Sequence, residues 1–303
     1  MPLVFAAYCL WGLFPLYFPL LEPASATEIL AHRFVWTFVL MGLLIGTRGQ
    51  WRQLRTASAR TWVSLVAAAI FISANWGVYV YTVNTDRVSE AALGYFINPL
   101  VAVLLGVFFL GERLNRAQLV AVVLAAIAVV VMTIDVGTPP LLGLTLAISF
   151  GVYGLLKKQV QLSSAVSLSA ETAIITPIAL VYLWWLSANG TSTFTEYGWQ
   201  HTALLMSAGV ATSLPLLLFG AGAKSVPMMT IGMLQYFTPT VQMLIAVFIN
   251  GEHITAGRWV GFIIIWVAVA ISVADMATRA GRARRQRRRH RMHPATAASA
   301  SAS

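Results

Sequence analysis

The sequence contains few charged residues and almost no cysteine. Asp, Glu, Lys and Arg make up 10% of its 303 residues, whereas soluble domains carry about 25%. Its single cysteine, Cys9, excludes a disulfide bond within the chain. In place of charge the chain is 58% hydrophobic, and its mean hydropathy is +0.77. This composition excludes an ordinary soluble domain and is typical of a protein embedded in a membrane.

Short motifs of enzymes are missing as well. The sequence has no H-E-x-x-H, no G-x-S-x-G and no Gly-rich phosphate loop, and its few His and Glu residues are far apart. We therefore predict no enzymatic activity, no catalytic residue, no metal site and no cofactor.

Ten apolar stretches are long enough to cross the hydrocarbon core of a bilayer, which needs about 20 helical residues. Backbone amides find no water there, and the stretches lack the alternating polarity of barrel strands, so we expect helices. The first stretch lacks the cleavage site of a secretory signal and should stay in the membrane. The predicted fold class is an all-α membrane protein with spans at 3–20, 28–46, 61–84, 89–110, 117–134, 141–156, 166–186, 199–222, 227–249 and 257–276.

Lys and Arg are distributed unevenly between the loops that join these spans. With the N-terminus in the cytoplasm, the outer loops hold Arg87 and Arg258 alone. Because cytoplasmic loops attract positive charge, we expect both termini to be cytoplasmic. The inner loops then hold Arg48, Arg52, Arg55, Arg60, Arg113, Arg116, Lys157, Lys158 and Lys224.

Most of the formal net charge of +10 comes from arginines between positions 279 and 291. A nucleic-acid site would mix aromatic residues into such a run, and none is present. A basic run directly after a membrane span is better explained as an anchor for anionic lipid headgroups. We therefore predict a basic, disordered cytoplasmic tail over 278–303 that contacts membrane lipids, and no nucleic-acid partner.

The two halves of the chain resemble each other. "GYFINPLVAVLLGVFFLGE" at 94–112 aligns without a gap with "LQYFTPTVQMLIAVFINGE" at 234–252, about 140 residues later. Trp11 and Gly12 align in the same way with Phe150 and Gly151. Each half holds five spans, an odd number, so the second half enters the membrane in the opposite direction. The sequence therefore predicts two inverted five-helix repeats, 1–135 and 136–277, as in secondary carriers.

Pro99 and Pro239 interrupt equivalent spans of the two repeats. A proline removes a helical hydrogen bond and leaves a carbonyl that needs protein or a wet cavity around it. Polar residues that are close to the two prolines suggest a cavity near the membrane midplane that binds a small-molecule substrate. Simple helix packing is the alternative explanation. The candidate lining residues are Tyr95, Asn98, Pro99, Gln235, Tyr236, Thr238 and Pro239, together with Trp11.

Ionisable residues inside spans are the second indication of a site. A charge at the centre of a span costs about 2.5–3.5 kcal/mol, so His32, Arg33 and Glu171 need a reason to be there. We expect them to gate or couple the cavity, although Arg33 could instead extend to the membrane surface. Asn75 adds a hydrogen-bonding side chain on the third span, where Trp76 either lines the site or simply packs against neighbouring side chains.

The stretches "AAYCLWGLFPLYF", "EILAHRFVW", "SANWGVYVYTVN", "EAALGYFINPLVAVLLGVFFLGERL" and "LQYFTPTVQMLIAVFINGE" resemble the RarD proteins of the EamA branch of the drug/metabolite transporter superfamily. The resemblance covers nearly the whole chain. It implies ten helices in two inverted repeats, a bacterial inner-membrane location and the family label of chloramphenicol-resistance permease.

These observations together predict a secondary transporter of small metabolites or drugs that works by alternating access. A channel and a non-transporting membrane scaffold remain alternatives. The sequence does not specify the substrate, the direction of transport, proton coupling or exchange, or the oligomeric state.

Overall fold

The computed structural model describes residues 1–85, 87–137, 139, 141–249, 251 and 253–292. Of residues 83, 84, 88, 89, 276, 277 and 279–292 it describes the backbone alone. Within this part of the chain the structure is helical and without strands, and ten helical segments are long and apolar enough to cross a membrane. The predicted fold class and number of spans are confirmed.

The elements are α1 (Pro2–Gly12), α2 (Phe14–Tyr17), η1 (Phe18–Leu21), α3 (Ala26–Thr47), α4 (Trp51–Arg55), α5 (Ala59–Asn84), α6 (Val88–Leu110), α7 (Arg116–Val136), α8 (Leu141–Gln159), α9 (Ser164–Ala188), α10 (Gly198–Ala223), α11 (Met228–Gln235), α12 (Phe237–Phe248) and α13 (Ala256–Met292).

Two of the ten segments are interrupted. The first consists of α1, α2 and the 3-10 turn η1, and a proline is the second residue of each of the two short pieces. The ninth is divided into α11 and α12 at Tyr236, three residues before Pro239, which has no N–H to donate to the preceding turn. By contrast, α6 continues as one helix through Pro99. The two aligned prolines therefore have different local consequences.

Polar caps mark where other helices begin. The Ser25 hydroxyl accepts the Glu28 amide at the start of α3. Asn115 and Gln118 exchange hydrogen bonds of 3.0 Å as a capping box at the start of α7. Gly111 ends α6 at a φ of 65°, a left-handed conformation that favours glycine. These local signals explain why the apolar runs end where they do.

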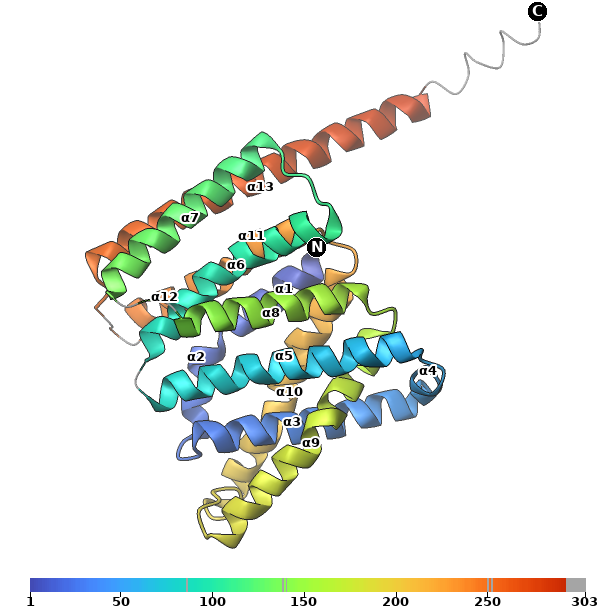
Figure 1. Ribbon diagram of the computed structural model, residues 1–303, viewed down its shortest axis with the longest axis vertical. Coiled ribbons are helices and arrows are strands. Elements are labelled where there is room, and N and C mark those ends of the chain that lie inside the picture. The colour runs from blue at the N-terminus through green and yellow to red at the C-terminus, as the bar shows by residue number, and fades with distance from the viewer. Residues whose placement is uncertain (86, 138, 140, 250, 252, 293–303) are drawn as a thin grey trace, which may run out of the picture.

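The helices form one bundle in which α3, α5, α6, α7, α8 and α13 run roughly along a common direction, whereas α9 and α10 cross them steeply (Figure 1). Helix α7 packs along α13, α6 packs against both α8 and α11, and α3 packs against α9 and α10. Helix α13 then projects beyond the bundle. It remains helical to Met292. Ala and Arg are strong helix formers, and the membrane span already supplies the helical nucleus that they extend. Residues 293–303 lie outside the described chain.

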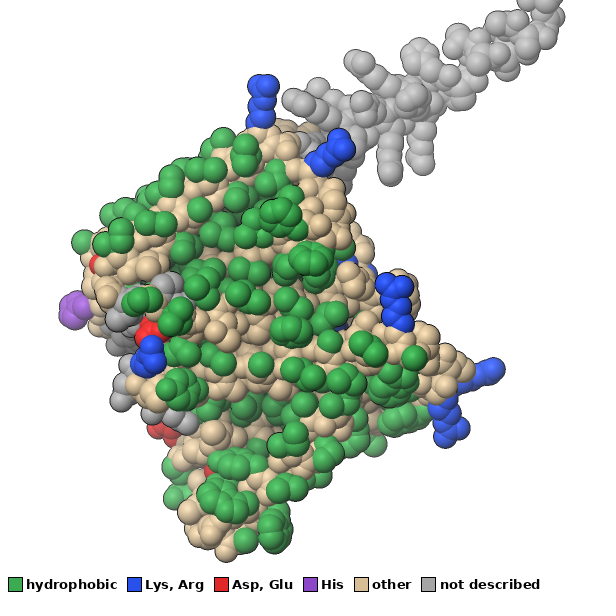
Figure 2. Space-filling view, in the orientation of Figure 1, with side chains coloured by type: hydrophobic (Ala, Val, Ile, Leu, Met, Phe, Trp, Pro, Cys, Tyr) green, Lys and Arg blue, Asp and Glu red, His purple; other side chains and the backbone are tan. Residues whose placement is uncertain are grey.

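The lateral surface of the bundle is apolar. Green side chains cover the face in Figure 2, and large residues such as Trp199, Phe108 and Ile134 are more than 70% exposed. Blue side chains gather mainly toward the right and top of this view. We call this the basic end, and it contains the loops 48–58, 111–115, 160–163 and 224–227. The opposite end contains the loops 22–25 and 189–197 and residues 253–255.

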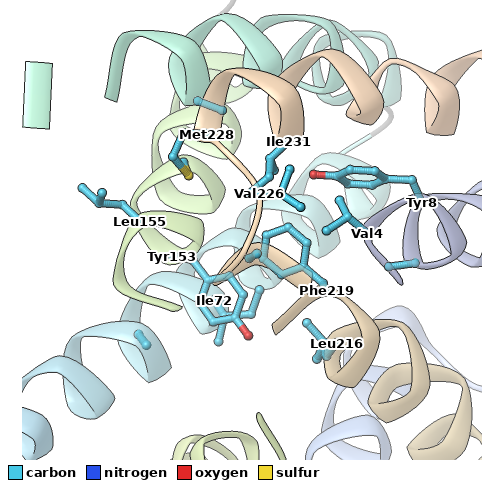
Figure 3. Packing of buried hydrophobic residues seen from close by; sticks show 14 of the residues in the cluster. Val4, Tyr8, Ile72, Tyr153, Leu155, Leu216, Phe219, Val226, Met228 and Ile231 are labelled. Carbon is cyan, nitrogen blue, oxygen red and sulfur yellow. The ribbon is translucent and has the colours of Figure 1, made fainter. Parts of the chain in front are cut away.

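An apolar cluster fills the half of the bundle nearest the basic end. Phe219 lies between Tyr8 and Tyr153, with ring centroids 6.1 and 6.4 Å away (Figure 3). All three side chains are almost fully buried. Met228 and other residues of α10 and α11 pack around them. We call this group the closing cluster, because it fills the space between the two halves of the chain at this end.

Candidate functional site

A cavity of about 670 Å³ lies between the helices. Its wall includes Glu22, Val136 and His253, which lie at the opposite end of the bundle, in or beside the connections between helices. Deeper in the bundle it reaches Trp11 and Leu216, next to the closing cluster. The cavity therefore extends from the opposite end to the middle of the bundle, and the closing cluster separates it from the basic end.

Nine of the thirteen candidate residues line this cavity, and they come from both halves of the chain. Their side chains are supplied by α1, α3, α5, α6, α11 and α12. They are Trp11, Arg33, Asn75, Trp76, Tyr95, Asn98, Gln235, Thr238 and Pro239.

Tyr236 and Pro99 do not line the cavity, although we predicted both there. The Tyr236 hydroxyl donates to the Phe96 carbonyl at 3.2 Å, so the side chain turns toward α6 and is buried. The Pro99 carbonyl faces Gly232, where an added Cβ would lie 2.7 Å from that oxygen. These residues allow close approach of α6 and α11 behind the cavity wall.

His32 also points away from the cavity. Its ring stacks on Phe194 with centroids 4.7 Å apart, and its Nδ1 accepts the Trp36 indole N–H at 3.3 Å. It lines a separate hollow of about 290 Å³ beside residues 192–195. The physical reason is helical geometry, because neighbouring residues His32 and Arg33 cannot face the same direction.

Glu171 belongs to a buried ion-pair network near the basic end. Its carboxylate accepts Lys157 Nζ at 2.8 Å, the Ser167 hydroxyl at 2.5 Å and the Tyr153 hydroxyl at 3.3 Å. Lys157 and Glu171 are both about 2% exposed. The network connects α8 to α9 and lies outside the cavity wall. We had assigned Lys157 to a loop because it ends an apolar run, so the partner of Glu171 was missed.

Several polar groups of the cavity wall hold helices together. Asn75 Nδ2 donates to the Leu146 carbonyl at 2.8 Å and to Ser149 at 3.0 Å, which joins α5 to α8. The Thr238 hydroxyl donates to the Tyr8 carbonyl at 2.9 Å, and Gln242 donates to the Trp11 carbonyl at 3.2 Å. These contacts satisfy backbone acceptors near the break in the first span. Gln242 was not predicted, although it lies three residues after Pro239 and therefore on the same side of α12.

Two polar side chains of the wall keep unused hydrogen-bonding capacity. Asn98 is 3% exposed, and its Oδ1 has no partner among the described residues. Arg33 is 8% exposed, and its Nε donates to the Thr212 hydroxyl at 2.9 Å. Its guanidinium carbon lies 4.1 Å from the centroid of the Trp76 ring. These two groups are therefore available to bind a ligand.

Polar contacts reinforce the closure at the basic end. The Glu112 carboxylate accepts the backbone N–H of Met228 at 2.7 Å and of Met229 at 3.0 Å, at the start of α11. Glu112 follows α6 in the first half of the chain, so it connects the two halves. Lys224 donates to the Leu162 carbonyl. Partial burial, together with the nearby charge of Lys157, lowers the pKa of Lys224.

The EamA-like transporter family matches the chain twice, over residues 1–134 and 138–274. The chain is 46% identical over 274 residues to Protein RarD of Streptomyces exfoliatus, with 89% of this chain and 87% of the relative covered. It is 40% identical over 275 residues to Protein RarD of Escherichia coli (strain K12), with 90% and 93% covered. It is 30% identical over 280 residues to Chloramphenicol-sensitive protein RarD of Pseudomonas aeruginosa, with 90% and 92% covered. A protein of known crystal structure has a similar fold, with a TM-score of 0.67 at 17% identity and with 89% and 94% of the two chains covered.

Proposed function

Because the chain belongs to the EamA-like transporter family, we propose that this multi-pass membrane protein is a secondary transporter of small metabolites or drugs. It moves its substrate across the bacterial inner membrane by alternating access and performs no chemistry on it. The observation that carries the proposal is the cavity of about 670 Å³, which is lined by both halves of the chain and closed at one end. A transporter must bind its substrate in a site that is open to one side at a time.

Inverted repeats are the architecture of many alternating-access carriers, and the packing supports two such repeats in this chain. Helices α1 and α8 are the first spans of the two halves, and α5 and α10 are the third spans. The contact of α5 with α8 therefore corresponds to the contact of α10 with α1, and both contacts occur. Helices α3 and α9 are the second spans of the two halves, α7 and α13 are the fifth spans, and the two members of each pair pack against each other. Phe96 and Tyr236, which occupy equivalent positions, are joined by a hydrogen bond. The rings of Trp11 and Phe150, also equivalent, lie 5.7 Å apart. These pairs are expected near a two-fold axis that relates 1–135 to 136–277.

The positive charge at the basic end supports a cytoplasmic location for that end and for both termini. The cavity then opens to the outside, and the closing cluster blocks the cytoplasmic side. The arginines of residues 279–291 would contact anionic lipid headgroups on the cytoplasmic face. The chain has no role in binding nucleic acid in this proposal.

A channel is less well supported than a transporter. An open channel needs a continuous path, whereas the rings of Tyr8, Tyr153 and Phe219 fill the route from the cavity to the basic end. A scaffold would not need a cavity of this size. Amphenicols belong in a substrate screen, because one relative is named a chloramphenicol-sensitive protein.

Transport can be tested with purified protein in liposomes. We expect saturable uptake that is accelerated by the same substrate inside the vesicles, in a screen of amphenicols, amino acids and small organic acids, with and without a pH gradient. Ala92→Trp places a large ring in the cavity wall and should abolish uptake. Leu104→Trp, at a position 51% exposed on the outer surface, is the matched control and should transport normally. Ionic conductance without saturation would instead indicate a channel, and equal uptake by both variants would contradict the assignment of the cavity.

A further inference from the structure

Arg33 is a buried cation in the cavity without a carboxylate partner among the described residues. Its guanidinium has five N–H donors, and one of them, on Nε, is used by Thr212. No acceptor in the described part of the chain binds the terminal Nη groups. These groups are arranged as a planar fork, which matches the two oxygens of a carboxylate.

The surroundings of Arg33 compensate its charge only in part. The rings of Trp76, Phe18 and Phe14 lie 4.1, 5.7 and 5.8 Å from the guanidinium carbon. Aromatic faces attract a cation, but they do not replace the negative charge that a buried guanidinium needs. An anion that enters the cavity would supply this charge in an environment where water screens it weakly.

Other charges of the cavity do not offer the same binding site. Arg258 lies 3.9 Å from Asp135, so a carboxylate already accompanies it. Among the described residues of the wall, Glu22 is the only carboxylate, and it is exposed at the opposite end. A substrate with a positively charged ammonium group would therefore find no described carboxylate beside Arg33.

The rest of the wall defines the remainder of the ligand. Trp11, Tyr79 and Tyr95 contribute aromatic surface to the cavity. The unpaired Oδ1 of Asn98 accepts hydrogen bonds and so favours a hydroxyl or amide N–H on the ligand. One guanidinium balances one negative charge, so a dianion would leave an excess charge in a mainly apolar cavity.

We propose that the cavity selects small organic monocarboxylates with an apolar or aromatic body. The carboxylate accepts two hydrogen bonds from the Nη groups of Arg33, and Asn98 accepts a hydroxyl or amide hydrogen from the same molecule. The proposal rests on the transport function proposed above and identifies its substrate class. Neutral molecules of similar shape, including amphenicols, and zwitterionic amino acids bind less tightly because they leave the charge of Arg33 uncompensated or introduce an unpaired ammonium group.

The test compares matched probes on the full-length protein. Binding of 4-hydroxyphenylacetate, 4-hydroxyphenylacetamide, tyrosine and chloramphenicol is measured by quenching of tryptophan fluorescence in detergent. Uptake of the same compounds is measured in liposomes at about pH 8, where the carboxylate is ionised and crosses protein-free membranes slowly. We expect the acid to bind at least tenfold more tightly than its amide. Arg33→Gln should remove this preference, so that the acid and its amide bind about equally. Arg33→Lys should restore part of it, because Lys keeps the charge but loses the fork.

The binding and uptake measurements separate the two proposals. Tighter binding of the acid that depends on Arg33, without uptake, would support carboxylate recognition and contradict transport. Saturable uptake that is equal for the acid and its amide and is unaffected by Arg33→Gln would support transport and overturn carboxylate recognition. If Arg33→Gln fails to fold, the comparison of acid and amide on the unmodified chain decides, and equal affinities there overturn the inference.

Discussion

Glu112 provides the most direct test of how the basic end stays closed. Its carboxylate accepts two backbone N–H groups at the start of α11, at 2.7 and 3.0 Å. A hydrogen bond to a charged group contributes about 1.5–3 kcal/mol, and negative charge at a helix N-terminus adds about 0.3–1 kcal/mol. Glu112→Gln removes the charge and places an amide NH2 against one of these N–H donors. We expect the closed state to lose about 2 kcal/mol relative to a state open at the basic end, a shift of roughly 30-fold in their populations.

This shift can be measured by cysteine labelling. Cys9→Ala removes the natural cysteine, and Val226→Cys places a probe at a position that is 4% exposed, beside the closing cluster. A membrane-impermeant maleimide is added to the cytoplasmic side of inverted vesicles. Labelling should be slow with Glu112 present and should accelerate by at least tenfold with Glu112→Gln.

The control for this experiment is Glu196→Gln, which changes an exposed carboxylate at the opposite end of the bundle. It should leave the labelling rate unchanged. An equal rate in Glu112→Gln and in the control, in protein that melts normally, would refute the idea that Glu112 stabilises the closed basic end.

Three further predictions concern the buried polar groups and the topology. Lys157→Met should lower the stability of the fold by about 3–5 kcal/mol, because Glu171 then keeps a buried charge without its cation. Lys157→Met combined with Glu171→Leu should recover most of this loss. An additive loss in the double variant would contradict the explanation. Asn98→Ala should lower substrate affinity with little change in melting temperature. Asn75→Ala should lower the melting temperature, because it removes the hydrogen bonds that join α5 to α8. The reverse pattern would show that Asn75 binds the substrate and that Asn98 stabilises the fold. In the Cys9→Ala background an impermeant reagent added outside intact cells should label Tyr197→Cys and not Arg55→Cys, and the opposite result would invert the topology.

The membrane spans could be predicted because hydropathy is averaged over many residues. A span of about 20 apolar residues outweighs single exceptions such as Arg33, so its existence is insensitive to local detail. The end of α13 was less predictable. Hydropathy falls after Asp275, but the backbone remains helical to Met292, since helix propensity and hydropathy are separate properties.

The cavity wall was partly predictable, because helical spacing shows which residues share a face. Tyr95 and Asn98, which we chose for their proximity to a proline, both line the cavity. The same spacing shows that His32 and Arg33, as neighbours, cannot both face the cavity, and the structure assigns that face to Arg33. Which of the two turns inward depends on tertiary contacts, here with Phe194 and Trp76, and therefore could not be read from one helix.

The hydrogen-bond partner of each polar side chain could not be predicted from the sequence. Asn75 and Asn98 are the same residue type on neighbouring spans, and both line the cavity. Asn75 donates to α8, whereas the Oδ1 of Asn98 has no described partner. The difference depends on whether a neighbouring helix presents a free backbone carbonyl within about 3 Å, which is a property of the packed bundle. A polar residue inside a membrane span therefore identifies a position that needs a partner, and the assembled helices determine whether that partner is protein or substrate.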